Sequence, residues 1–243
     1  MIRQPARSVC ITVDMEQDCP PFLSTWRGAV EGTPVLLALL AKEGVPATFF
    51  VTGELARRFP NIVRQIVSAG HELGSHGDMH HDFRRLAPEE ARADIEQSTA
   101  TLRQFDAVTS FRAPYLQMPA GYVPFLDAQG YRLDASTARY KWPGRGVHRA
   151  GAVLRVPASA TSSTLRWRRG PRDWLLSRLS EPAVLFVHPW EFVDLRRAPI
   201  PLDCRFKTGD AAVACLRESI QVLRRRQPRF VRMRDYADLR RQA

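Results

Sequence analysis

Segments with strand character alternate with segments of helical periodicity along most of this sequence. Strands are predicted at 8–13, 47–51, 110–112, 131–133, 183–187 and 230–233, with a further short strand just before His76. Helical patterns separate many of them, and a repeated strand–helix order favours a mainly parallel sheet. The alternation therefore predicts an α/β fold.

Capping residues mark where several of the intervening helices begin and end. Thr33 and Pro34 suit the start of a helix that runs through position 40, and Gly44 ends it. Pro88 opens a long helix through position 102, with two glutamates near its positive end. Further helices are predicted at 62–69, 211–223 and ahead of position 130, whereas 135–170 is less regular.

The length of the chain is typical of one α/β barrel. The 243 residues are 44% hydrophobic, and they contain no internal repeat, low-complexity segment or linker, so we expect a single domain over 1–243. No run of about 18 apolar residues is present to span a membrane. The N-terminal segment has no signal-peptide core, which favours a cytoplasmic location. The four cysteines form no CxxC pair, which favours free thiols.

The net charge of +11 comes mostly from arginine in the C-terminal half. The segment with the highest density of basic residues combines arginine with tryptophan: Arg166, Trp167, Arg168, Arg169, Arg172, Trp174 and Arg178. Such a surface suits an anionic membrane, a phosphate-bearing substrate or nucleic acid, or is simply a solvated face. No nucleic-acid motif is present, so we expect no nucleic-acid partner and keep peripheral membrane contact as an alternative.

His76 and His80 lie four residues apart, a spacing that lets two imidazoles share a metal ion. Catalytic zinc usually takes three protein ligands and leaves a fourth position for water. The acidic cluster at 14–18 offers carboxylates for the third position. The alternative is that both rings are hydrogen-bonded interior or loop histidines.

Four chemically active residues follow predicted strands directly: Asp14, His76, Arg112 and His188. The carboxyl ends of parallel strands meet at one edge of a sheet or barrel, where α/β proteins build their sites. The order of the elements therefore predicts one shared site.

The motifs around these residues resemble those of the polysaccharide deacetylases of the NodB-homology type, carbohydrate esterase family 4. The resemblance covers 12–188 and rests on four segments: Thr12-Val13-Asp14-Met15-Glu16, His76-Gly77-Asp78-Met79-His80, Arg112-Ala113-Pro114-Tyr115 and Phe186-Val187-His188. The last continues as Pro189-Trp190-Glu191, which is similar to a branch with an Asp-x-Glu first motif. The resemblance to the family implies a distorted TIM-like (β/α) barrel with about seven parallel strands.

The resemblance also implies roles for individual residues. The metal ligands would be Glu16, His76 and His80, holding a divalent ion such as Zn²⁺. Asp14 would be the general base, oriented by Arg112, and His188 the general acid. The backbone N–H of Tyr115 would help to bind the oxyanion.

The first motif departs from the family pattern, because Met15 replaces the usual metal-binding aspartate. Glu16 is the preferred replacement ligand, since it lies on the same side of an extended backbone as Asp14, and Asp18 is the alternative. The family's further aspartate, which supports the catalytic histidine, matches Asp134 best.

The resulting prediction is a metal-dependent hydrolase that removes an N-acyl group, most simply acetyl, from an aminosugar of a glycan or glycolipid. Two alternatives remain open. One is a deformylase or amidase acting on a lipid-linked aminosugar or a small cyclic amide. The other is a relative that binds sugar without turnover.

Overall fold

The strands of the computed structural model, which describes residues 7–141 and 146–242, form a single sheet. They are β1 (Ser8–Met15), β2 (Ala47–Val51), β3 (Glu72–Ser75), β4 (Ser110–Phe111), β5 (Leu133–Asp134), β6 (His148–Ala150), β7 (Val153–Arg155), β8 (Ala183–Val187) and β9 (Arg229–Phe230). Their order is β6-β7-β5-β4-β3-β2-β1-β8, and β9 pairs with the start of β1. Among the described residues only the β6–β7 pairing is antiparallel, so seven strands from β7 to β8 run parallel as predicted.

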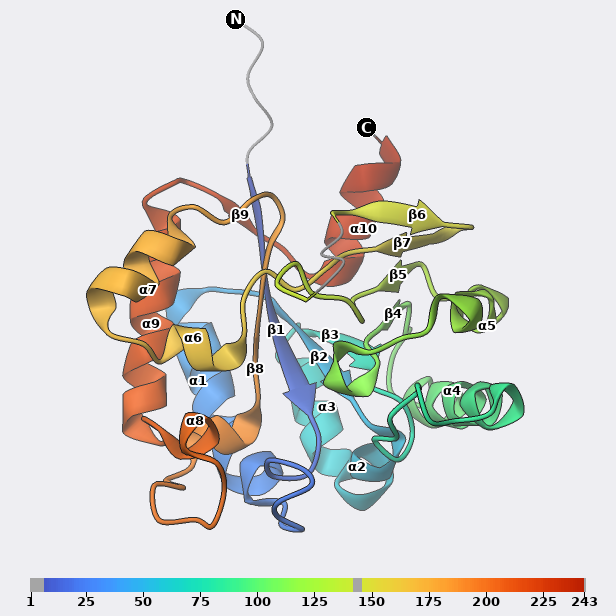
Figure 1. Cartoon of the computed structure of the whole chain (residues 1–243), viewed down its shortest axis with the longest axis horizontal. Helices are drawn as coiled ribbons and strands as arrows, with labels where there is room; N and C mark the ends of the chain where they lie inside the picture. Colours follow the sequence, from blue (N-terminus) through green and yellow to red (C-terminus); the bar gives the residue numbers. More distant parts are fainter. Residues whose placement is uncertain (1–6, 142–145, 243) are drawn as a thin grey trace, which may run out of the picture.

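Helices cover the sheet on both sides of the central strand β1 (Figure 1). They are α1 (Thr33–Glu43), α2 (Gly53–Arg58), α3 (Pro60–Ser68), α4 (Pro88–Leu102), α5 (Val123–Ala128), α6 (Ser162–Leu165), α7 (Arg169–Leu176), α8 (Leu202–Arg205), α9 (Asp210–Arg224) and α10 (Met233–Gln242). Every residue of β1, β2 and β8 is buried, as expected for parallel strands packed on both faces. No helix in the described ranges has the length and hydrophobicity of a bilayer-spanning segment.

The two ends of the sheet are joined by irregular backbone, which makes the barrel distorted. The backbone N–H of Ser159, beyond β7, donates a hydrogen bond of 2.8 Å to the carbonyl of Val184 in β8. The side-chain hydroxyl of Ser159 accepts a bond from the N–H of Val184 in return. The less regular stretch predicted from the sequence therefore contains β6, β7 and α6 and also closes the barrel.

The predicted strand at 230–233 is wrong in its second half, because helix α10 begins at Met233. Two buried side chains of the sheet bind the free N–H groups at the start of this helix. The hydroxyl of Thr48 accepts from the N–H of Met233 at 2.9 Å, and the carboxylate of Glu72 accepts from the N–H of Arg234 at 2.9 Å. These contacts satisfy donors that a helix start leaves unpaired.

Candidate metal centre and active site

Most residues predicted to carry chemistry lie at or just beyond strand ends and meet at one edge of the barrel. Glu16 follows β1, His76 follows β3, Arg112 follows β4 and His188 follows β8. They lie in or against a cavity of about 240 Å³, whose lining includes Asp14, Glu16, His76, His80, Tyr115 and His188. The parallel strand order thus brings together positions up to 174 residues apart in the sequence, between Asp14 and His188.

Three side chains in this cavity have the arrangement of a metal site. The ligand atoms of Glu16, His76 and His80 all lie within 4.8 Å of one another. The Oε2 atom of Glu16 is 3.2 Å from Nε2 of His76 and 2.6 Å from Nε2 of His80. Around a tetrahedral zinc with bonds of about 2.1 Å, ligand atoms lie about 3.4 Å apart, and the separations in this donor set lie on both sides of that value, so small side-chain movements would accommodate such an ion.

The ring orientation of His76 is fixed by the backbone. Its Nδ1–H donates a hydrogen bond of 2.7 Å to the carbonyl oxygen of Arg112, which leaves Nε2 free to act as a ligand. Metal-binding histidines usually have a second partner of this kind. Burial opposes ionisation of Glu16, but the charge of His80 and the hydrogen bonds of both imidazoles hold its pKa well below its usual range. The carboxylate is therefore ionised and ready to bind a cation.

Asp18, the alternative carboxylate ligand, is fully engaged elsewhere. Its side chain accepts hydrogen bonds from the hydroxyl of Thr25 at 2.6 Å and from the N–H groups of Arg27 and Gly28 at 2.8 Å. Cys19, directly after it, has a φ of 46°, so the chain turns sharply beyond Asp18. The carboxylate that faces the two histidines is that of Glu16.

Asp14 has a buried guanidinium as its partner. Nη1 of Arg112 donates to Oδ1 of Asp14 at 2.7 Å and to the hydroxyl of Thr12 at 2.7 Å. The guanidinium also stacks over the ring of Phe50 at 4.3 Å, and Arg112 has no exposed surface. The expected Asp14–Arg112 pair is thus present, and it fixes the Asp14 carboxylate in one orientation at the edge of the cavity.

His188 is held by a carboxylate that the sequence interpretation did not assign. Its Nδ1 lies 2.8 Å from Oε1 of Glu191, three residues later in a short 3-10 helix (Pro189–Phe192). Its Nε2 faces the metal site, 3.7 Å from Oε1 of Glu16. Burial alone would lower the pKa of His188, but the hydrogen bond from Glu191 and the charge of Glu16 outweigh it and raise the pKa to about 9. The imidazole is therefore protonated at neutral pH.

Glu191 is in turn neutralised by a buried arginine. Nε of Arg166 lies 3.1 Å from Oε2 of Glu191, and both side chains are almost fully buried. A sequence signal for Glu191 did exist, because a glutamate three residues after a helix start, here with proline at the first position, can accept from the capping N–H, and Glu191 accepts from the N–H of His188 at 2.9 Å.

The prediction that Asp134 supports the catalytic histidine is contradicted by the structure. The Asp134 carboxylate accepts from Nε of Arg155 at 2.7 Å and from the N–H of Ser136 at 2.9 Å, so its hydrogen bonds are made within its own part of the sheet. The Ser136 hydroxyl accepts from the N–H of Ala113 at 2.7 Å. Asp134 therefore positions the turn after β4, and Glu191 is the partner of His188 that was predicted to be Asp134.

Tyr115 lies beside the metal site on that turn. Its ring packs edge-on against His80 at a centroid distance of 4.9 Å, and its backbone has a φ of 60°. The Nζ of Lys141 donates to its carbonyl oxygen at 2.6 Å. Tyr115 thus lines the cavity, and the role of its N–H in binding an oxyanion stays a prediction.

Curated relatives of this chain are named as deacetylases of chitooligosaccharide and of peptidoglycan. The chain is 26% identical over 201 residues to a chitooligosaccharide deacetylase of Bradyrhizobium sp. (strain ANU 289), covering 80% of this chain and 79% of that protein. It is 32% identical over 118 residues to a peptidoglycan-N-acetylglucosamine deacetylase of Bacillus cereus, covering 47% of this chain and 43% of that protein. The chain thus spans less than half the length of the second relative.

Solved structures share the fold over almost the whole chain. A protein from Mycobacterium smegmatis assigned as a polysaccharide deacetylase superposes with a TM-score of 0.76 at 20% identity, covering 100% of this chain and 93% of the other. A pseudoenzyme of carbohydrate esterase family 4 from Bacillus anthracis superposes with a TM-score of 0.63 at 17% identity, covering 96% and 66%. At these identities the likeness establishes the fold alone.

The family model described as polysaccharide deacetylase matches residues 2–133, which is more than half of the chain and includes Asp14, Glu16, His76, His80 and Arg112. The chain belongs to the polysaccharide deacetylase family.

Proposed function

We propose that this protein is a metal-dependent hydrolase that removes the acetyl group from an N-acetylhexosamine unit of a glycan or glycolipid. One observation carries the proposal: a metal-ligand set, an arginine-paired carboxylate and a carboxylate-paired histidine open into the same cavity. Amide hydrolysis needs these three functions, which are an activated water, a base for its proton and an acid for the departing nitrogen. The printed functions of the curated relatives point to the same substrate class.

Glu16, His76 and His80 would hold the divalent ion, and Zn²⁺ suits their nitrogen and oxygen donors. Such an ion, when bound, lowers the pKa of a coordinated water and polarises a carbonyl oxygen. The Asp14 carboxylate accepts the proton of the attacking water. Arg112 holds this carboxylate in place through a buried hydrogen bond of 2.7 Å.

His188 supplies the second proton transfer. The water oxygen bonds to the acetyl carbon, and the carbon–nitrogen bond then breaks, so the nitrogen must leave as an amine. Nε2 of His188 donates the proton to that nitrogen while Glu191 stabilises the imidazolium through Nδ1. The N–H of Tyr115 is our candidate for a donor to the developing oxyanion. The products are acetate and the free aminosugar.

Acetate release from N-acetylglucosamine oligomers and N-acetylated glycolipids, with and without a chelator, tests this proposal. We expect the chelator to abolish release and Zn²⁺ to restore it. Asp14→Asn should lower kcat by about 10²- to 10⁴-fold, the usual contribution of general base catalysis. Asp127→Asn is the matched control, because this aspartate is exposed on α5. Wild-type rates in Asp14→Asn would remove the proposed base.

The same assay separates the two alternatives. Release of formate from an N-formyl aminosugar, with no acetate from the acetylated form, would indicate a deformylase. A relative that only binds sugar would bind the oligomers but release neither acid, and the occurrence of this fold in a pseudoenzyme keeps that outcome in the test.

We also propose peripheral contact with an anionic membrane through exposed aromatic and basic side chains between positions 167 and 207. We call this set the tryptophan face; it consists of Trp167, Trp174, Arg178, Phe206 and Lys207. Its three aromatic rings are between 45% and 59% exposed. The guanidinium of Arg178 lies 4.5 Å from the ring of Trp174, and Nζ of Lys207 lies 5.3 Å from the ring of Phe206. Aromatic rings paired with basic side chains suit the headgroup region of an anionic bilayer.

Co-sedimentation with vesicles tests the tryptophan face. At low salt we expect binding to vesicles containing an anionic lipid, no binding to purely zwitterionic vesicles, and release as salt screens the charges. The double variant Trp174→Ala, Phe206→Ala should lose binding. Failure of the wild-type protein to bind anionic vesicles at low salt would contradict the proposal. A cytoplasmic location, at the inner membrane face, remains our proposal.

A further inference from the structure

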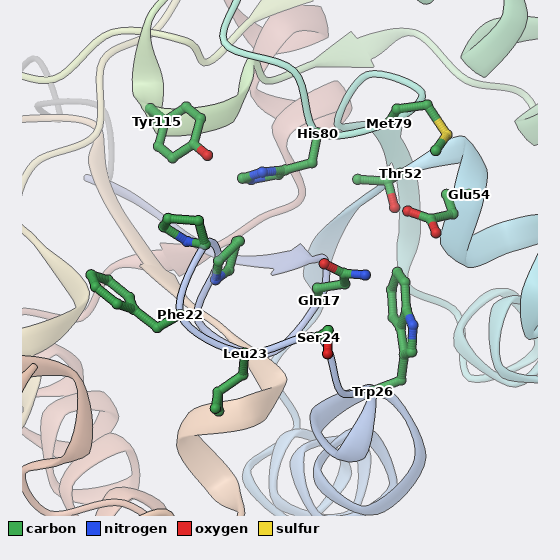
Figure 2. Close-up of a pocket in the computed structure, with 12 residues that line it drawn as sticks. Gln17, Phe22, Leu23, Ser24, Trp26, Thr52, Glu54, Met79, His80 and Tyr115 are labelled. Atoms are coloured by element: carbon green, nitrogen blue, oxygen red, sulfur yellow. The ribbon is translucent and has the colours of Figure 1, made fainter. Parts of the chain in front are cut away.

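A second cavity, of about 390 Å³, adjoins the proposed catalytic cavity (Figure 2). The two cavities share four lining residues, namely Pro20, Phe22, His80 and Tyr115, so a ligand held at the metal site can extend into the second. We call this second cavity the side groove. Its volume is within the range of small-molecule sites, and it is too polar to be a gap in the core.

The walls of the side groove combine hydrogen-bonding groups with flat apolar surface. Figure 2 shows the polar ends of Gln17, Thr52 and Glu54 directed into the space, with the indole of Trp26 along one wall. Trp26 is itself fixed, because its ring packs on Phe59 at a centroid distance of 5.7 Å. A rigid aromatic wall facing several polar groups suits a sugar ring, which has apolar faces and a polar rim.

The described lining of the side groove has a carboxylate but no lysine or arginine side chain, although the protein carries a net charge of +11. The chain has 36 lysines and arginines against 25 acidic residues, yet Glu54 is the one acidic residue among the groove-lining residues that the structure describes, and no lysine or arginine is among them. The neighbouring Arg57 already has a carboxylate partner, because its two Nη groups donate to Asp78 at 2.7 and 2.9 Å. Within the described ranges, the half-buried Glu54 makes no ion pair within 4.0 Å.

From this charge pattern we propose that the side groove binds a hexosamine with a free amino group, and that Glu54 pairs with its ammonium. This inference rests on the proposed function: the reaction leaves an amine on each sugar that it processes, so the neighbouring unit of a partly deacetylated chain carries the cation that the groove lacks. A carboxylate aimed at that cation favours such a chain over a fully acetylated one. The protein would then act preferentially next to units already deacetylated.

Kinetics on defined trimers tests the preference. We compare kcat/KM for acetate release from the N-acetylglucosamine trimer with that from trimers carrying one free amine, at each of the positions. The wild-type protein should prefer at least one amine-bearing trimer, and Glu54→Gln should reduce that preference about fivefold, as expected for one partly exposed ion pair. An unchanged ratio in Glu54→Gln would overturn the inference.

Glu89→Gln is the matched control for this variant. Glu89 is the second residue of α4, as Glu54 is of α2, so both substitutions remove a carboxylate from the first turn of a helix. Glu89 is exposed and does not line the groove. Glu89→Gln should leave the ratio of kcat/KM values between the trimers as in the wild-type protein. Melting temperatures of both variants report on folding.

Binding of the glucosamine trimer, which has no acetyl group to remove, separates this inference from the proposed function. Calorimetry should give a Kd that rises about fivefold in Glu54→Gln and with added salt, but not in Glu89→Gln. Equal Kd values for Glu54→Gln and wild type would overturn the inference even if the protein is an active deacetylase. The same titration remains informative if no acetate is released from any trimer.

Discussion

Asp14 and His188 each have a buried partner of opposite charge in the site. Arg112 fixes the carboxylate of Asp14, while Glu191, itself paired with Arg166, fixes the imidazole of His188. Each partner orients a group that we propose to transfer a proton, and Glu191 also raises the pKa of His188. This division of roles leads to variants whose effects differ in kind.

Glu191→Gln should shift the pH profile of the reaction. The acid form of His188 is required, so kcat falls as pH rises through the pKa of this imidazole, which the Glu191 hydrogen bond helps to raise to about 9. Without the Glu191 charge that pKa falls, and the alkaline limb of the kcat profile moves to lower pH. We also expect kcat to fall by about 10- to 100-fold, as for other residues that orient a site. An unshifted limb would show that Glu191 does not tune His188.

Asp134→Asn should act on stability and leave that pH limb in place. Asp134 and Arg155 form a pair in which neither side chain is more than 6% exposed, and removing one charge of such a pair typically costs about 3–5 kcal/mol of unfolding free energy. Denaturant titration measures the loss. A displaced alkaline limb in Asp134→Asn would instead restore the role that the sequence motif suggested for this residue.

The sequence was sufficient to group six candidate site residues: Asp14, Glu16, His76, His80, Arg112 and His188. Five of them lie at or just after a strand end, and His80 lies four residues after His76. The sequence was not sufficient to choose the partner of His188. That choice depends on the direction of side chains in different elements, Asp134 facing Arg155 and Glu191 folding back by a short 3-10 turn. Local pattern carries no information on which of two acids points at a distant ring.

Two elements next to the site pack against each other through glycine. Gly28 and Gly32 lie one helical turn apart in a π-helix (Gly28–Gly32), and both face the turn that contains His188 and Glu191. A Cβ atom on Gly32 would lie 2.1 Å from the carbonyl oxygen of Pro189, and one on Gly28 would lie 2.4 Å from the backbone nitrogen of Trp190. The absence of side chains at these positions therefore sets where the catalytic histidine lies.

Gly32→Ala should consequently lower both stability and activity. The added methyl group must displace backbone, at a cost of about 1–3 kcal/mol for overpacking, and the displaced turn carries His188 with it. Thermal melts and kcat measurements check the two effects. Gly121→Ala is the matched control, because a Cβ atom there meets nothing within 4 Å. A Gly32→Ala protein with wild-type kcat and melting temperature would contradict this packing argument.

At the level of elements, local sequence pattern predicted those with strong signals and missed those made by distant contacts. The buried strands β1, β2 and β8 and the helix α4 were predicted close to their observed bounds. The start of α10 was predicted as strand from its local pattern. It is helical in the structure, where its first N–H groups are bound by Thr48 and Glu72 from other strands. Such long-range hydrogen bonds override local preference and are invisible in a window of the sequence.

In the molecule as a whole, a bound cation would connect the strand end after β1 with the loop after β3. Glu16 follows β1, whereas His76 and His80 follow β3, so their common ligand would act as a cross-link in the folded state alone. At 100 times its Kd, an ion that binds only the folded protein stabilises it by about 2.7 kcal/mol. We therefore expect Zn²⁺ to raise the melting temperature and a chelator to reverse the effect. A Zn²⁺-independent melting temperature would argue against a site formed by folding.

The stoichiometry of Zn²⁺ binding tests the central claim most directly. Metal analysis after dialysis against dilute Zn²⁺ should find one equivalent in the wild-type protein and in His148→Ala, whose imidazole binds the carbonyl of Gly146 away from the site. Glu16→Gln and His76→Ala should each retain far less. One equivalent retained in both of these variants, or none in the wild-type protein, would contradict the assignment of Glu16, His76 and His80 as the ligands of a catalytic ion.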